Sequence, residues 1–207
     1  MPIELWLSLF VVCLLGAMTP GPSLNVILNV VTENGRLHGI VASWSHAIGV
    51  GLYALLSVTG LAYLLQQSPL LFKTLSWLGV LYLLWLGIKA WIAASNSLTE
   101  YQKKTSSNLL SSAIQGGLIS LLNPKLGLFF IALFSQFVLL VDNFLGNVIL
   151  VLTPFIVDGL WYTLVSIFLS QSIILNKLRE HSTTINRLTG IIFILLAINL
   201  IWHISIK

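Results

Sequence analysis

Charged side chains are scarce in this sequence. Asp, Glu, Lys and Arg together make up 8% of the 207 residues, whereas 57% of the residues are hydrophobic. Soluble proteins carry roughly 25% charged residues, so a soluble chain of this composition lacks the polar side chains to cover its surface. The composition therefore excludes an ordinary soluble domain and indicates a polytopic membrane protein surrounded by a lipid bilayer.

Cysteine is nearly absent, and the histidines are not clustered. Cys13 is the only cysteine, so the chain has no internal disulfide. The four histidines are dispersed without the spacing of metal ligands, and we expect neither a metal site nor a cofactor. The net charge of +4 is scattered among loops and forms no basic stripe, which argues against nucleic acid as a partner.

Six apolar stretches are each long enough to cross a bilayer as a helix, which takes about 20 residues. They cover residues 5–31, 39–65, 70–94, 109–140, 146–170 and 188–204. These stretches predict an all-α fold in which residues 1–207 form a single transmembrane domain, with a cytoplasmic linker at residues 95–108. The first stretch has the apolar core of a signal peptide. Because its flank carries Glu4 and no Lys or Arg, we interpret it as a retained helix.

The basic residues predict the orientation of the chain. Seven of them lie near the loops after the first, third and fifth stretches: Arg36, Lys89, Lys103, Lys104, Lys177, Arg179 and Arg187. Only Lys73 and Lys207 lie on the other side, and Lys125 falls within the fourth stretch. Since cytoplasmic loops are enriched in Lys and Arg, we expect both termini outside the cytoplasm.

Two proline motifs interrupt the apolar stretches. The first is Thr19-Pro20-Gly21-Pro22, and the second is Asn123-Pro124-Lys125. Proline lacks an amide hydrogen and clashes with the preceding turn, so the first and fourth helices are predicted to be broken. Such breaks are tolerated in a membrane where the freed backbone groups face protein or a wet cavity. Paired breaks in the two halves of a transporter point to its binding site.

The halves of the chain also resemble each other. Gly51-Leu52-Tyr53 is similar to Gly159-Leu160-Trp161, and residues 79–91 can be laid on residues 190–202. The two breaks occupy corresponding positions, so repeat one covers about 1–94 and repeat two about 109–207. Because each repeat has three helices, an odd number, the repeats are predicted to cross the membrane in opposite directions.

Five motifs along the chain resemble the LysE/RhtB family of amino-acid exporters. They are Thr19-Pro20-Gly21-Pro22, the glycine- and tyrosine-containing stretch 77–87, Leu122-Asn123-Pro124-Lys125, Phe134-Ser135-Gln136-Phe137 and Asp158. The resemblance implies six helices in two inverted repeats in the cell inner membrane. It also implies export of amino acids or close derivatives, driven by the proton gradient, and no enzymatic activity. Whether the chain forms a homo-oligomer is left open.

The form of the first motif favours the homoserine/threonine-like branch of that family. Ser45-His46 departs from the usual pattern and leaves the substrate open. Two other functions stay open as well: the same fold exporting a different solute or a metal ion, and a membrane enzyme or scaffold that transports nothing. Ser43 or Ser45 with His46 is a poor hydrolase dyad, because residues this close on one helix are badly placed to activate each other.

An amino-acid substrate is a zwitterion, so its site needs donors for the carboxylate and acceptors for the ammonium. Helix ends supply both, because the N-terminus carries free amides and partial positive charge and the C-terminus the reverse. The candidate substrate-binding residues are Thr19, Pro20, Gly21, Pro22, Ser23, Asn25, Asn123, Pro124, Lys125 and Asp158. The alternative is that both breaks are only packing kinks.

Three ionisable residues lie within the apolar stretches, and two of them are candidates for proton coupling. A charge at the bilayer centre costs about 2.5–3.5 kcal/mol on insertion scales, so such residues usually face a partner or a cavity. We expect Lys125 to pair with Asp158 or to bind the substrate carboxylate, unless it reaches the membrane interface instead. Asp158 is the first candidate proton carrier, and His46 is the second because histidine titrates near physiological pH. For both, the alternative is a hydrogen bond that only holds helices together.

Overall fold

The computed structural model describes residues 1–92, 108–141, 143–168 and 181–206. The regular elements in these ranges are all α-helices: α1 (Ile3–Met18), α2 (Pro22–Asn34), α3 (Arg36–Gln67), α4 (Pro69–Ile92), α5 (Leu109–Leu121), α6 (Pro124–Phe137), α7 (Phe144–Phe168) and α9 (Ser182–Ile206). The linker predicted at 95–108 lies outside the described residues except for Asn108, and so do Lys103, Lys104, Lys177, Arg179 and Lys207.

The helices match the predicted spans. Among the described residues, four helices are long and apolar enough to cross a membrane, and the number rises to six if each bent pair is one span. The pairs are α1 with α2, bent by 61°, and α5 with α6, bent by 54°. An all-helical polytopic membrane protein is therefore confirmed, and both interruptions occur at the predicted prolines.

The last helix begins earlier than its apolar stretch. It was predicted over 188–204, but α9 starts at Ser182. Hydropathy marks only the part of a helix that lies in hydrocarbon, and a polar first turn can extend beyond it. Arg187, just before the predicted stretch, lies on this helix with its guanidinium 6.0 Å from the centre of the Trp91 ring on α4.

The outward surface of the bundle is apolar. Leu56, Leu70 and Ile92 are among many large apolar side chains that are mostly exposed. Hydroxyl groups on the helices bond to their own backbone, as Thr59 Oγ1 does to the Leu55 carbonyl at 2.7 Å. Since hydrocarbon offers no hydrogen-bond partners, this pattern fits contact with lipid.

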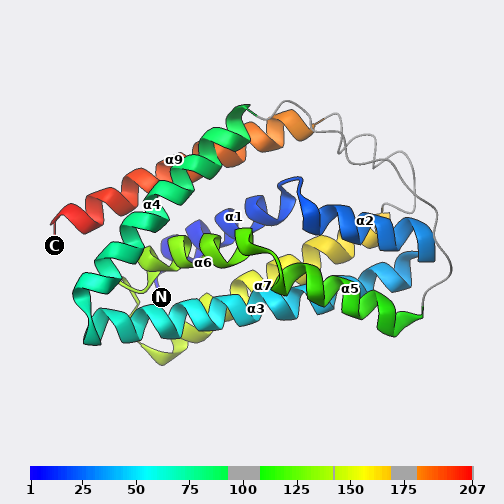
Figure 1. The fold of residues 1–207 in the computed structure, drawn as a ribbon, viewed down its shortest axis with the longest axis horizontal. Coiled ribbons are helices and arrows are strands. Elements are labelled where there is room, and N and C mark those ends of the chain that lie inside the picture. The colour runs from blue at the N-terminus through cyan, green and yellow to red at the C-terminus, as the bar shows by residue number, and fades with distance from the viewer. Residues whose placement is uncertain (93–107, 142, 169–180, 207) are drawn as a thin grey trace.

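Corresponding helices of the two halves pack against each other. Figure 1 shows α3 running antiparallel to α7, and α4 antiparallel to α9, and the same two pairs are in extensive contact. The α4–α9 crossing is close because it is formed by glycines: a Cβ added to Gly87 would lie 2.9 Å from the Gly190 carbonyl oxygen. Inverted repeats would give such pairs, and the inverted relation of the two halves itself stays a prediction. The start of α1 and the end of α9 lie at the same end of the bundle (Figure 1).

Candidate functional site

The first turns of α2 and α6 are set by the proline motifs. Gly21 is the N-cap of α2 and Pro22 its first residue, where a missing amide hydrogen costs nothing. Asn123 is the N-cap of α6 and Pro124 its first residue, and here the side chain makes the cap: Asn123 Oδ1 accepts a hydrogen bond of 3.1 Å from the Lys125 amide. Gly21 is half-buried and Asn123 is buried, whereas Pro22 and Pro124 are exposed. The N-terminal partial positive charge of each helix therefore lies at the edge of the packed interior.

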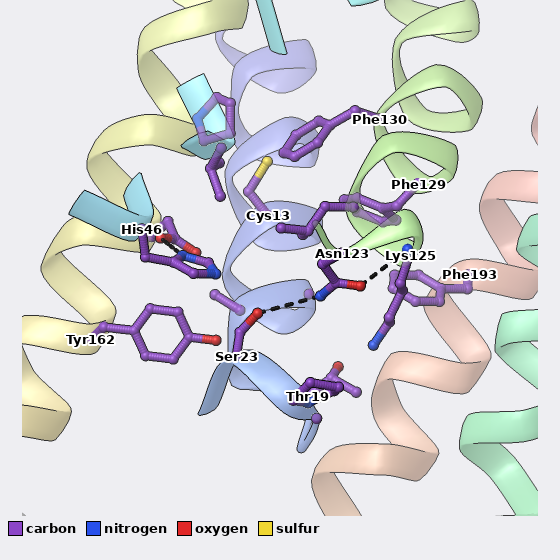
Figure 2. Close-up of a pocket in the computed structure, with 18 residues that line it drawn as sticks. Cys13, Thr19, Ser23, His46, Asn123, Lys125, Phe129, Phe130, Tyr162 and Phe193 are labelled. Atoms are coloured by element: carbon purple, nitrogen blue, oxygen red, sulfur yellow. Dashed lines mark hydrogen bonds and ion pairs between the residues drawn. The ribbon is translucent and has the colours of Figure 1, made fainter. Parts of the chain in front are cut away.

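Both breaks face one cavity in the middle of the bundle (Figure 2). Its volume, measured as the space open to the centre of a water molecule, is about 60 Å³. A single water needs roughly 10–15 Å³ on this measure. The cavity is lined by Cys13, Gly16, Ala17, Thr19, Gly21, Pro22, Ser23, His46, Val50, Asn123, Lys125, Leu126, Phe129, Phe130, Pro154, Asp158, Tyr162 and Phe193.

Two contacts connect one break to the other. The Asn123 side-chain amide donates a hydrogen bond of 3.4 Å to Ser23 Oγ. The ammonium of Lys125, from the second break, lies beside the first: a Cβ added to Gly21 would lie 4.0 Å from Lys125 Nζ. A third contact ties the first break to α9, because Thr19 Oγ1 lies 3.3 Å from Thr189 Oγ1.

Asp158 pairs with His46 rather than with Lys125. Asp158 Oδ2 lies 2.7 Å from His46 Nδ1, and both side chains are buried. The expected Lys125–Asp158 pair is therefore wrong. The reason is that α3 packs along α7 and brings His46 to Asp158, whereas Lys125 is drawn to the first break. The His46–Asp158 contact is the only salt bridge that the structure gives among the described residues, and it is an ion pair only when His46 is protonated.

The second ring nitrogen of His46 faces the cavity. His46 Nε2 is buried and has no hydrogen-bond partner among the described residues. The ring is packed edge-on against Tyr162, with ring centres 5.1 Å apart. In Figure 2 the Ser23–Asn123 hydrogen bond lies between His46 and Lys125. The cavity thus has a cation at one end and, at the other, a histidine–carboxylate pair whose free nitrogen can accept or donate a hydrogen bond.

Most of the residues proposed from the sequence meet at this cavity. Lining it are Thr19, Gly21, Pro22, Ser23, His46, Asn123, Lys125 and Asp158. Pro20 and Pro124 line an adjoining groove instead, and Asn25, in the first turns of α2, lines neither.

The apolar wall of the cavity was not predicted. It includes Cys13, Val50, Phe129 and Phe130, whose sequence surroundings do not indicate which face of each helix points inward. Pro154 also lines the cavity, but the sequence did carry a local signal for it, a proline within an apolar stretch. It lies inside α7, one turn before Asp158, and a proline there removes the helical hydrogen bond to the Leu150 carbonyl.

The described residues contain no group of three His, Cys, Asp or Glu side chains placed to hold a metal ion. Ser43, which with His46 would form a poor hydrolase dyad, makes its hydrogen bonds to other groups. Its Oγ donates to the Gly39 carbonyl at 2.7 Å and lies 3.3 Å from Ser166 Oγ.

Comparison with known proteins assigns the chain to a family. The family described as LysE type translocator matches residues 14–203. The chain belongs to the LysE-type translocator family. The resemblance stated from the motifs is therefore confirmed, and the chain is a multi-pass membrane protein of a transporter family.

Similar proteins include two that are named for efflux. A leucine efflux protein of Enterobacter sp. (strain 638) is 36% identical over 124 residues, which cover 58% of this chain and 57% of the relative. A homoserine/homoserine lactone efflux protein of Salmonella typhimurium is 34% identical over 143 residues, or 67% of each chain. An uncharacterized membrane protein of Haemophilus influenzae is 27% identical over 204 residues, covering 95% of this chain and 96% of the relative. No solved structure matches the chain.

Proposed function

We propose that this LysE-type translocator exports amino acids with uncharged side chains, or close derivatives, from the cytoplasm by proton antiport across the cell inner membrane. The observation that carries the proposal is the cavity between the two helix breaks, with Lys125 at one end and the His46–Asp158 pair at the other. The names of the relatives, which concern leucine and homoserine, support the amino-acid part of the proposal.

The carboxylate of the substrate binds at the breaks. Lys125 supplies a full positive charge, and the first turns of α2 and α6 add the partial charge of their N-termini. The α2 N-terminus has no side-chain cap. Its first-turn amides at Ser23 and Leu24 therefore take the carboxylate in place of a cap.

The ammonium of the substrate and the transported proton compete for the His46–Asp158 pair. With His46 neutral and its Nδ1 hydrogen donated to Asp158, the Nε2 lone pair accepts a hydrogen bond from the ammonium. With a proton on Nε2, the pair is occupied and repels a second positive charge. Because one nitrogen binds either a proton or the ammonium, the pair exchanges one for the other, and alternating access turns that exchange into antiport.

The substrate's side chain lies against the apolar wall, which includes Cys13, Val50 and Phe130. Among the described residues, Asp158 is the one carboxylate that lines the cavity, and it is already paired with His46. A Lys or Arg substrate would therefore bury a second cation without a partner, which is costly. We expect leucine, threonine and homoserine to be carried better than lysine or arginine.

The test is transport in proteoliposomes with a labelled amino-acid panel, with and without a pH gradient. We expect the wild type to transport a neutral amino acid saturably and uphill when the gradient is imposed. Asp158→Asn should lose gradient-driven accumulation but keep exchange of labelled for unlabelled substrate across the membrane, which needs no proton. Glu4→Gln is the control, because Glu4 is exposed and lines no part of the cavity. Full proton-driven accumulation by Asp158→Asn would refute the role of the His46–Asp158 pair in proton coupling. Absence of transport by correctly inserted wild type would refute the export function.

A further inference from the structure

A groove of about 520 Å³ adjoins the central cavity. It runs between α4, α6 and α9 and reaches both helix breaks. Thr19, Gly21, Pro22, Asn123, Lys125 and Phe193 line both the groove and the cavity. The groove and the cavity are therefore neighbouring compartments that share one wall, and Lys125 is the charged residue in that wall.

The charge of the groove has one sign. In the part of the chain that the structure describes, Lys89 and Lys125 are the charged residues that line it, and no Asp or Glu does. Neither lysine has an acidic partner among the described residues. Lys89 Nζ instead lies 4.7 Å from the centre of the Trp85 ring on the same helix, an arrangement that fixes the ammonium without neutralising its charge. A cleft of one sign with low-dielectric walls attracts oppositely charged ligands and raises their rate of binding.

The position of Lys89 gives the groove a direction. Lys89 is in the last turn of α4, which ends at Ile92, and Asn186 lines the groove from the first turns of α9. These helix ends lie on the side that the distribution of Lys and Arg assigns to the cytoplasm. An exporter must take up its substrate on this side.

We propose that the groove is the route by which the substrate reaches the cavity from the cytoplasm, and that Lys89 with Trp85 forms an outer site for the substrate's carboxylate. The inference rests on the proposed export function. The carboxylate meets Lys89 first and then passes to Lys125, while Tyr82, Trp85 and Leu86 line the path of its side chain. Lys89 lines the groove but not the cavity, so it acts on capture of the substrate and not on the coupled step.

The experiment compares Lys89→Gln with Lys73→Gln. Lys73 is the matched control, because it is an exposed lysine in the first two turns of the same helix and lines neither compartment. Both variants are reconstituted in vesicles of zwitterionic phosphatidylcholine, and initial rates of leucine uptake are measured from the face that corresponds to the cytoplasm. We expect Lys89→Gln to raise KM by about 3- to 10-fold with little change in maximal rate. Lys89→Arg should restore KM, and Lys73→Gln should match the wild type. Added salt should raise the wild-type KM more than that of Lys89→Gln, because screening weakens the attraction that the variant lacks.

Several results would overturn the proposal. One is an unchanged KM in Lys89→Gln, and another is an equal change in Lys73→Gln. A loss confined to the maximal rate would place Lys89 in the conformational change and not in capture. An effect of Lys89→Gln that appears only when anionic lipid is added would assign the groove to a lipid headgroup. If the wild type carries neither leucine nor any other amino acid, the export function itself is refuted. If the wild type transports and Lys89→Gln has the same KM, only the outer site is refuted.

Discussion

The buried pair of His46 and Asp158 leads to a prediction about stability that does not depend on transport. His46 is 1% exposed and Asp158 is 6% exposed. Replacing His46 by Phe keeps an aromatic ring against Tyr162 but leaves the Asp158 carboxylate without its hydrogen-bond donor. Replacing Asp158 by Leu in the same protein then removes the unpaired carboxylate as well.

Removing one partner of a buried ion pair costs about 3–5 kcal/mol, whereas replacing both by apolar residues of similar volume is often neutral. In a chain of roughly 150–250 residues, 1 kcal/mol shifts Tm by about 2–4 °C. The Tm values of the variants should therefore fall in a definite order. His46→Phe should lower Tm by roughly 6–20 °C, and the double variant should recover most of the loss. Asp158→Asn keeps an acceptor for His46 Nδ1 and should lose only about 0.5–1.5 kcal/mol.

Cys13 provides the assay. It is the only cysteine and it is buried, so a fluorescent dye that reacts with thiols reports unfolding of the purified protein in detergent as the temperature rises. Cys13→Ser is the control for labelling elsewhere. A His46→Phe protein as stable as the wild type, or a double variant less stable than both single variants, would show that the His46–Asp158 contact is not a desolvated ion pair.

Three further predictions concern the backbone. Gly116→Ala should destabilise the protein by about 1–3 kcal/mol in the same assay, because a Cβ there meets the Ala42 carbonyl; Gly60→Ala, with nothing within 4 Å of its added Cβ, should be neutral or slightly stabilising, and equal effects would refute the close contact. Gly35→Ala should cost about 1–3 kcal/mol because Gly35 has φ +89 and ψ 173; an unchanged Tm would contradict that strain. Asn123→Ala should cost about 0.5–2 kcal/mol through loss of the α6 cap, and Asn123→Asp, which retains the cap, should recover stability.

The parts of the fold that were predicted from the sequence depend on local signals. Apolar length sets the spans, and proline stops a helix wherever it occurs. Thr19 to Pro22 and Asn123 to Lys125 therefore marked both breaks before any tertiary contact was known. Orientation of the chain, proton coupling and the inverted relation of the repeats remain predictions.

The partner of Asp158 could not be predicted in this way. His46 and Asp158 are separated by 112 residues, and their contact depends on the rotation of α3 and α7 about their own axes. Apolar residues surround most of both helices, because one face meets lipid and the other meets protein. The sequence therefore has no polar face that fixes this rotation. Lys125 was the expected partner of Asp158 because both lie deep in their apolar stretches, but the Lys125 ammonium lies beside Gly21 instead. For the same reason, the sequence could not predict that Phe129 and Phe130 line the cavity.

The two interrupted helices have a consequence for how the cargo can change during evolution. In the proposed site, part of the positive charge that faces the substrate's carboxylate comes from backbone amides at the starts of α2 and α6. No substitution of a wall side chain such as Cys13 or Val50 removes those amides. A lineage can therefore reshape the compartment for a new side chain while it keeps the means of holding the group common to all amino acids. Alanine scanning would leave this backbone contribution undetected, and only a substitution that rejoins a broken helix would expose it.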